Sequence, residues 1–199
     1  MNLMPPHISS EHLIFREHLM SPSSPPITAD ADQPLRILSS AHLANGPHAE
    51  LSELEFGMII AYNAFSRWIM RCMNAAGGAD MAVTDILVLH HVFHRERGKK
   101  LADICFTLNY EDTHVINYSL KKLATMGLVT GDKQGKEVFY SVTEQGVALI
   151  ERFCNVREHC LLASVEGDVA DGQATSEAAR RLRLLSGLYD QAARAASSL

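Results

Sequence analysis

Apolar residues recur at steps of three and four through residues 49–76, a spacing that predicts a long helix. The positions are Leu51, Leu54, Met58, Tyr62, Phe65, Trp68, Ile69 and Cys72. Gly77 and Gly78 come next, and glycine commonly ends a helix because it adopts the left-handed conformation freely. The apolar positions cover much of the helix circumference. This helix therefore requires a cover on several sides, from a large domain or from a second subunit.

Two shorter helical patterns follow this long helix. The first is predicted to begin near Thr84, a residue type that caps helices, with Asp85 next to it. Its apolar positions are Ile86, Leu87, Leu89 and Val92. The second covers residues 101–109 and comes after a charged turn. Both patterns predict short helices.

The fourth predicted helix, residues 111–126, has distinct inner and outer sides. Its inward residues are Val115, Ile116, Ser119, Leu120, Leu123 and Ala124. Two neighbouring outer rows repeat at steps of four, with Thr113, Asn117 and Lys121 in one and His114, Tyr118 and Lys122 in the other. Asn109 or Asp112 is available to cap the start, and Gly127 is predicted to end the helix.

A β-hairpin is predicted directly after this helix, over residues 128–140. β-Branched and aromatic residues at both ends supply strand propensity, and Gln134-Gly135 permits a tight turn. Lys133 and Lys136 flank the tip, so the hairpin projects positive charge beside the preceding helix. A plain ribbon that only caps the core is the alternative interpretation of the same residues.

The C-terminal third returns to helical patterns. Thr143 is a predicted cap for a helix that runs to about residue 163, and residues 166–176 are predicted to be a polar connector. A last helix is predicted over residues 176–195, with Leu182, Leu185, Tyr189 and Ala192 at heptad-like spacing. The fold class that follows is mainly α with a small β-hairpin.

The first 48 residues differ from the rest in composition. All seven prolines of the chain lie here, together with many serines. Such a segment cannot bury enough apolar surface to pack, so residues 1–48 are predicted to be a flexible arm and residues 49–199 a single domain.

Composition and charge narrow the class of protein. The chain has 199 residues, 47% hydrophobic and 21% charged, as in ordinary globular domains. The four cysteines form no CxxC pair, which favours buried, reduced thiols in a cytoplasmic protein over a secreted disulfide framework. No apolar run is long enough to span a membrane, and the N-terminus has no signal-peptide pattern.

Net charge is −5, which by itself argues against a nucleic-acid partner. The distribution argues the other way. Residues 95–140 hold eight Lys/Arg and six Asp/Glu, a balance of +2, so the remaining residues carry −7. Basic residues cluster at 95–100, at Lys121-Lys122 and at the hairpin tip. Charge clusters usually mark only solvated surface. The basic clusters therefore support a nucleic-acid interface only if the helix and hairpin on which they lie are suited to one.

Three short helices followed by a hairpin is the order of a winged helix-turn-helix. An α-helix fits the major groove of B-DNA, where Asn117 suits adenine and the Thr113 methyl suits thymine. Lys121 and Lys122 lie further along, at a place suited to phosphates or guanine. The predicted DNA-binding residues are Thr113, His114, Asn117, Tyr118, Lys121, Lys122, Lys133 and Lys136.

Residues 101–146 resemble the DNA-binding core of MarR-family transcriptional regulators. The resemblance is carried by L-x-x-L-A-x-x-G-L-V (120–129), by the hairpin and by V-T-E-Q-G (142–146). It extends to most of residues 50–195 and implies a core over residues 81–143. The family further implies a homodimer on a palindromic operator, with dimerisation helices at 49–76 and 144–196, and often a small aromatic or acidic effector that weakens DNA binding.

The hairpin departs from the family pattern. It is short and lacks the usual Asp-x-Arg-Arg; Asp132-Lys133 and Lys136 stand in its place. A lysine contact to phosphate is therefore expected from the wing tip at residues 132–137, in place of an arginine in the minor groove. The alternative function is a winged-helix module that binds a protein partner and no DNA, which the acidic net charge and Glu111-Asp112 favour. No catalytic constellation or cofactor motif is found in the sequence, so no enzyme is predicted.

Three other groups of residues suggest a site. His90 and His94 have a spacing that suits two ligands of one metal, although no third ligand lies nearby in the sequence, so no metal site is predicted. Cys72 and Cys160 have basic neighbours, as a redox-sensitive thiol would. An effector pocket would use aromatic and basic residues of the long helix, although helical spacing suits a plain core as well; these are Tyr62, Phe65, Trp68, Arg67 and Arg71.

Overall fold

The computed structural model describes residues 48–94 and 97–199. The predicted arm, residues 1–48, therefore lies outside the described residues except for His48, and so do Arg95 and Glu96 of the first basic cluster. The chain divides into two compact units, residues 1–53 and 54–199. Of the first unit only residues 48–53 are described.

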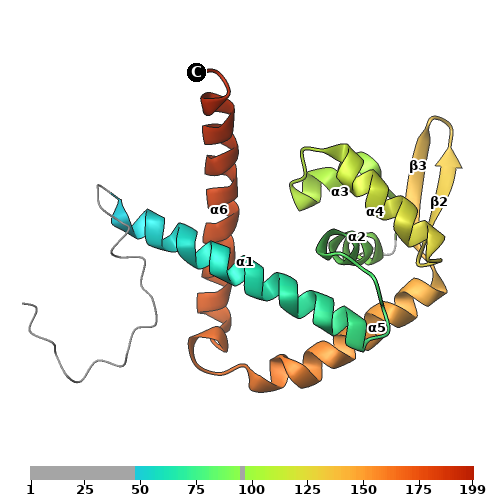
Figure 1. Cartoon of the computed structure of the whole chain (residues 1–199), viewed down its shortest axis with the longest axis horizontal. Coiled ribbons are helices and arrows are strands. Elements are labelled where there is room, and N and C mark those ends of the chain that lie inside the picture. Colours follow the sequence, from blue (N-terminus) through green and yellow to red (C-terminus); the bar gives the residue numbers. More distant parts are fainter. Residues whose placement is uncertain (1–47, 95–96) are drawn as a thin grey trace, which may run out of the picture. The chain divides into compact units, whose positions relative to one another are not determined.

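The long first helix, α1 (Ala49–Ala75), ends where the glycine pair predicts (Figure 1). Gly77 has a φ of 94°, and the amide of Gly78 donates to the carbonyl of Met73 at 2.9 Å. This pattern satisfies carbonyls that the end of a helix leaves unpaired. Only the C-terminal part of α1 reaches the core, through Ile69, Cys72 and Met73.

Three short helices follow: α2 (Val83–Phe93), α3 (Leu101–Leu108) and α4 (Thr113–Thr125). The cap predicted at Thr84 is wrong, because Ala82 occupies the N-cap position and the carboxylate of Asp85 accepts from its amide at 2.9 Å. Asn109 does not cap α4 either. It ends α3 in the left-handed conformation, with a φ of 54°.

Asp112 is the N-cap of α4, and its carboxylate accepts from the amide of His114 at 2.8 Å. The inner side of α4 is narrower than predicted. Ile116, Ser119, Leu120 and Leu123 are buried, but Val115 is 39% exposed and Ala124 is exposed as well. α4 packs on α2 and α3 through one stripe, and these two residues lie beyond its edges.

The predicted hairpin is present as β2 (Val129–Gln134) and β3 (Glu137–Val142). Within the described residues the sheet has a further strand that the sequence did not predict, β1 (Lys99–Lys100), in the antiparallel order β1-β3-β2. Lys99 lies opposite Tyr140 and Lys100 opposite Phe139. Two lysines show no alternation of apolar and polar residues, so a strand of this length has no sequence signal of its own.

Thr143 caps α5 (Glu144–Cys160) as predicted, since its hydroxyl accepts from the amide of Gly146 at 3.1 Å. The same hydroxyl donates to the carbonyl of Gly127 at 2.7 Å, which ties the end of α4 to the start of α5. α5 stops about three residues before the predicted end. The chain continues there as 3-10 turns at Leu162–Ser164 and Gly167–Val169.

The last helix, α6 (Gly172–Ala196), begins inside the segment predicted to be a connector. Asp171 caps it, accepting from the amides of Gln173 and Ala174 at 2.9 and 3.3 Å. Its polar first turn has no apolar periodicity, which is why the pattern placed the start too late. In the described chain α6 buries none of its residues.

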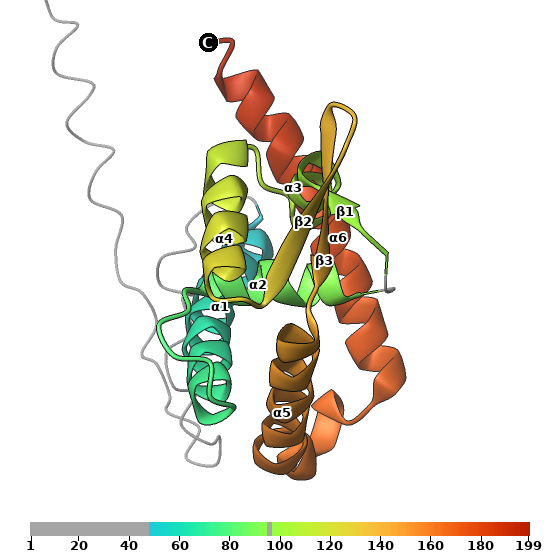
Figure 2. The same ribbon diagram turned by 90° about the vertical axis from the view of Figure 1, so that its right-hand side faces the viewer.

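The core lies where the end of α1, α2, α3, α4, the sheet and α5 meet (Figures 1 and 2). Its fully buried side chains include Met73, Ile86, Leu89, Ile104, Ile116, Leu120, Leu123 and Ile150. The predicted fold is confirmed, with the added strand and the shifted helix ends as corrections.

Gly146 is the point of closest approach between α5 and the chain after α4. A Cβ there would lie 2.6 Å from Cγ2 of Val142 and closer still to the carbonyl oxygen of Leu128. Gly146→Ala is therefore expected to lower the free energy of unfolding by about 1–3 kcal/mol, as overpacking does. Urea denaturation measures this change. Gly172→Ala, with nothing within 4 Å of the added methyl, is the control and is expected to change stability by no more than about 1 kcal/mol, towards greater stability.

Candidate nucleic-acid interface

The predicted DNA-binding residues come from two neighbouring elements, α4 and the β2–β3 hairpin. The two lie side by side in both views, and β2 follows α4 after a turn at Gly127 (Figures 1 and 2). Gly127 has a φ of 72°, and the amide of Leu128 donates to the carbonyl of Leu123 at 2.9 Å. This closed turn sets the direction of the hairpin relative to α4.

Most of the two predicted rows of α4 are exposed to solvent. Thr113, His114 and Lys121 are exposed, and Tyr118 is 72% exposed. Asn117 is half-buried at the middle of the helix. Together these side chains offer hydroxyl, imidazole, amide, phenol and ammonium groups on one side of a helix, which is the range of donors and acceptors that base edges and phosphates require.

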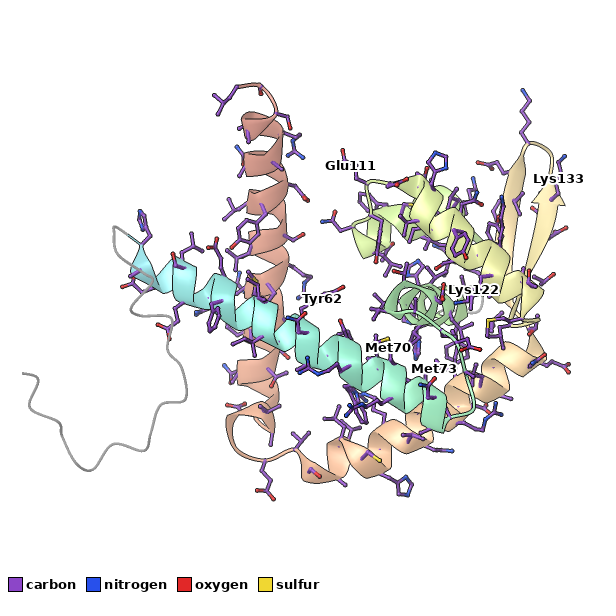
Figure 3. The ribbon with its side chains drawn as sticks, viewed as in Figure 1. Tyr62, Met70, Met73, Glu111, Lys122 and Lys133 are labelled. Atoms are coloured by element: carbon purple, nitrogen blue, oxygen red, sulfur yellow. The ribbon has the colours of Figure 1, made fainter. Side chains whose placement is uncertain are left out.

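The hairpin carries its lysines at the far end from the core. Lys133 lies opposite Val138 in the ladder, and Lys136 is the second residue of the two-residue loop. Gly135, the first loop residue, has a φ of 65°, which fits a tight hairpin turn with glycine in that place. Both lysines are exposed, and Figure 3 shows Lys133 on the outer part of the hairpin.

The acidic residues near these lysines are paired with other groups of the chain or lie near the start of α4. Glu137 pairs with Lys100 at 2.6 Å, and Asp132 accepts from the side chain of Gln134 at 2.9 Å. Asp112 is engaged by the first turn of α4, where a negative charge is favourable. Glu111 is exposed at the turn between α3 and α4 (Figure 3).

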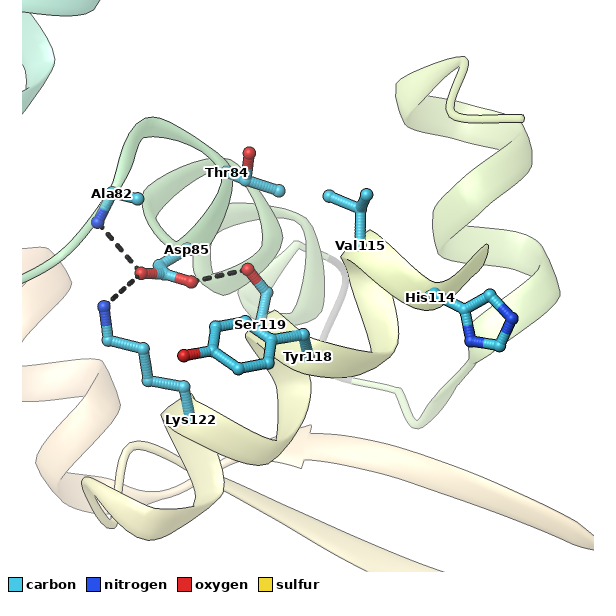
Figure 4. Close-up of a pocket in the computed structure, with 8 residues that line it drawn as sticks. All are labelled: Ala82, Thr84, Asp85, His114, Val115, Tyr118, Ser119 and Lys122. Atoms are coloured by element: carbon cyan, nitrogen blue, oxygen red, sulfur yellow. Dashed lines mark hydrogen bonds and ion pairs between the residues drawn. The ribbon is translucent and has the colours of Figure 1, made fainter. Parts of the chain in front are cut away.

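Lys122 lies elsewhere than its sequence row indicated. Its ammonium donates to the carboxylate of Asp85 at 2.7 Å and to the carbonyl of Asp80, and its side chain is 29% exposed. Figure 4 shows its side chain reaching the carboxylate of Asp85 on α2. The structure therefore binds the Lys122 ammonium to α2, although the side chain still lines one hollow with His114 and Tyr118 of its predicted row (Figure 4).

The partner of Lys122 is a buried carboxylate that no sequence pattern indicated. Asp85 is 2% exposed and also accepts from the hydroxyl of Ser119 at 2.5 Å (Figure 4). Burial raises the pKa of this carboxyl, but hydrogen bonds from Lys122, Ser119 and the Ala82 amide outweigh it, so the pKa is lowered. The available signal was Ser119, a polar residue in an apolar row, because buried hydroxyls require a partner.

A second feature is an apolar cavity of about 460 Å³ between α1, α2 and α5. Phe65 and Trp68 of the predicted effector-binding residues line it, whereas Tyr62 lies outside the lining and is 60% exposed. Arg67 and Arg71 do not line it; Arg157 of α5 is the basic residue at this cavity. The wall is completed by Ile69 of α1, by Leu161 just after α5, and by residues of α2 and α5, which are Ile86, Leu87, His90, Phe153 and Cys154.

His90 lies in the last turn of α2, where it is half-buried and forms part of this wall. Its Nδ1 lies 2.9 Å from the carbonyl of Ile86, and its ring meets Phe153 edge-on at 4.6 Å. Within the described chain Nε2 is buried without a hydrogen-bond partner. No group of three or more metal-binding side chains occurs in residues 48–94 and 97–199.

The four cysteines, all within the described residues, are free thiols. Cys72 and Cys105 are buried, and burial is the main cause that raises the pKa of both. Cys154 and Cys160 are exposed on α5, so the expectation of buried thiols is wrong for these two. A raised pKa disfavours the reactive thiolate, which makes Cys72 a poor redox sensor.

Burial lowers the pKa of His90, against a smaller opposite effect of the Ile86 carbonyl. As pH falls, the His90 ring therefore binds a proton more readily in the unfolded chain than in the folded chain. Stability is expected to fall as pH drops below about 6.5. His90→Leu should reduce the fall in thermal stability between pH 7 and pH 5 but not abolish it, because burial also lowers the pKa of His91. His159→Leu, at an exposed site on α5, is the control and should keep the wild-type slope. An unchanged slope in His90→Leu would assign the pH dependence to another group.

Residues 81–146 match the family of winged helix DNA-binding domains. A search of curated proteins finds no significant match. No helix among the described residues combines the length and hydropathy needed to cross a membrane.

Solved structures share the fold over most of the chain. A MarR-family transcriptional regulator from Rhodococcus sp. RHA1 has a TM-score of 0.57 at 15% identity, covering 70% of this chain and 96% of that one. Reduced AbfR bound to DNA has a TM-score of 0.58 at 17% identity, covering 70% and 94%. BpsR of Bordetella bronchiseptica, whose DNA binding is regulated by 6-hydroxynicotinic acid, has a TM-score of 0.52 at 16% identity, covering 71% and 99%.

The resemblance in the sequence is thereby confirmed at the level of the fold. Residues 81–146 are similar to winged helix DNA-binding domains, and the chain has the fold of MarR-family regulators.

Proposed function

We propose that this chain is a transcriptional regulator of the MarR type, which binds a palindromic operator in duplex DNA as a homodimer. α4 enters the major groove, and the β2–β3 hairpin contacts the neighbouring backbone. The observation that carries this proposal is that the exposed polar side of α4 and the lysine-tipped hairpin lie next to each other (Figures 1 and 2).

The residues assigned to DNA are the predicted set without Lys122. Asn117 faces adenine, which an amide can bind through two hydrogen bonds, and Thr113, His114 and Tyr118 contact the flanking bases or sugars. Lys121, Lys133 and Lys136 contact phosphates. Lys122 is left out of this set, because its ammonium is bound to Asp85.

A homodimer is supported by apolar surface that this chain leaves uncovered. On α1, Ile59, Ile60 and Tyr62 are between 51% and 60% exposed. On α6, Leu184 and Leu188 are 57% and 60% exposed. Exposed apolar patches of this kind mark interaction surfaces, and a helix without buried residues requires a partner to be stable. A second copy of the same helices supplies an apolar surface of equal length, as a twofold interface requires.

The apolar cavity supports a second element of the proposal, a small aromatic acid as effector. Phe65 and Trp68 offer ring contacts, and Arg157 offers a guanidinium to a carboxylate. Because Nδ1 of His90 faces the carbonyl of Ile86, its unpaired Nε2 can accept from a hydroxyl or N–H group of the ligand. The cavity lies between α1, α5 and α2, so a ligand there changes the packing between the proposed dimer helices and the winged helix. BpsR, whose DNA binding responds to 6-hydroxynicotinic acid, has the same fold.

The alternative function is a winged-helix module that binds a protein and no DNA. The net charge of −5 and exposed Glu111 favour it. It predicts no enrichment of any duplex, whereas the regulator predicts enrichment of one.

Selection of bound duplexes from a random pool, with the native mass measured in parallel, tests the proposal. A dimer that enriches a palindrome is the expected result. A monomer, or an enriched site without twofold symmetry, would contradict the dimer. Binding to nothing, even at low salt, would contradict DNA recognition altogether and leave the protein-binding module.

A further inference from the structure

Asp85 is an acidic side chain in a place where charge is costly. It lies in the first turn of α2 and is 2% exposed. A carboxylate taken out of water this far is stable only when its oxygens are bonded. One partner is local, since Oδ2 accepts from the Ala82 amide at 2.9 Å.

The other two partners both belong to α4. The hydroxyl of Ser119 donates to Oδ1, and the ammonium of Lys122 donates to Oδ2 at 2.7 Å (Figure 4). Ser119 and Lys122 are three residues apart, on the side of α4 that faces the start of α2. Two bonds separated along the helix axis restrict both the rotation and the sliding of α4 against α2.

The same contacts withdraw one positive charge from the outside of α4. Two of the donors of the Lys122 ammonium are occupied, by Asp85 and by the carbonyl of Asp80. The neighbouring Lys121 is exposed. α4 thus carries two consecutive lysines with opposite roles, one directed outward and one held inward.

We propose that Asp85 is a positioning and specificity-determining residue of the DNA-binding surface. It holds α4 in place against α2 and keeps Lys122 off the DNA backbone. This inference rests on the proposed function. A lysine free to bind phosphate would strengthen binding to every DNA sequence, and a loosened α4 would contact base edges less accurately. By preventing both, Asp85 increases the preference for the operator over random DNA.

Asp85→Asn tests the proposal, because the amide keeps the size of the side chain and can still accept from Ser119 but has no charge to hold Lys122. On random duplex the salt dependence of binding should steepen by about 0.9 in the log–log slope, the value for one additional phosphate contact. The ratio of selected to random affinity should fall. In the double variant Asp85→Asn/Lys122→Met the slope should return to that of the wild type. A mere loss of stability would lower affinity without steepening the slope.

Lysine acetylation of the wild-type protein, followed by mass spectrometry, provides a test that needs no variant. Lys122 should react slowly with or without duplex, whereas Lys121, Lys133 and Lys136 should react readily and be protected by duplex. Rapid labelling of Lys122, or an Asp85→Asn protein with the wild-type slope, would overturn the inference while wild-type binding stands. Failure of the wild type to bind any duplex would instead overturn the proposed function, and this inference with it.

Discussion

A chain that carries Leu184→Glu and Leu188→Glu is expected to be a monomer and to bind its selected operator at least about a hundredfold more weakly than the wild type. Both leucines are more than half exposed on α6, and in the described chain this helix has no buried residue. A charge placed in an apolar interface loses its hydration without gaining a partner, so the dimer should dissociate. Each winged helix would then bind its half-site alone, without the gain from linking two sites.

Sedimentation and operator titration at one salt concentration measure the two effects. The matched control is Gln173→Glu/Gln191→Glu, which adds the same two charges at exposed polar positions of α6. It should remain a dimer with nearly unchanged affinity. If the leucine variant were still a dimer, the second copy would have to be placed on another surface.

Asn117→Ala is expected to flatten the base preference at one position of each half-site. A side chain that bonds adenine through two hydrogen bonds contributes about 1–3 kcal/mol of discrimination, so the preference there should fall roughly 5- to 150-fold. Repeating the selection of bound duplexes with the variant reads this out directly. Affinity for random duplex should change far less, because Asn117 carries no charge.

Lys133→Ala is the complementary control, since a phosphate contact carries no sequence information. It should weaken binding to all sequences alike and reduce the salt slope by about 0.9. Should both variants bind the operator as the wild type does at matched salt, α4 would not be the element in the major groove.

The elements of the winged helix were predictable because their signals are local. The end of α1 at Gly77, the end of α4 at Gly127 and the cap at Thr143 each follow from the conformation or hydrogen bonding of one residue type, and the structure has all three. The hairpin followed in the same way from its strand propensity and its glycine turn. The errors occurred where several residues competed for one role, as at Thr84 and Asn109.

Strand β1 and the start of α6 were not predicted, because neither has a pattern of apolar residues in its own sequence. Two lysines become a strand only because β3 offers them an unpaired edge, and nothing in their own sequence specifies this. The polar first turn of α6 is helical because Asp171 caps it, without an apolar stripe that would reveal it.

The sequence by itself determined the class of fold, the order of its elements and which residues stand on the outer rows of α4, because helix spacing, caps and turn glycines act within a few residues. Only the tertiary structure decided which of those residues are available. Lys121 and Lys122 are neighbours of the same type, yet one is exposed and the other is bound to a carboxylate 37 positions away in the chain. That difference depends on α2 packing against α4, and the burial of Asp85 that results makes the pairing necessary.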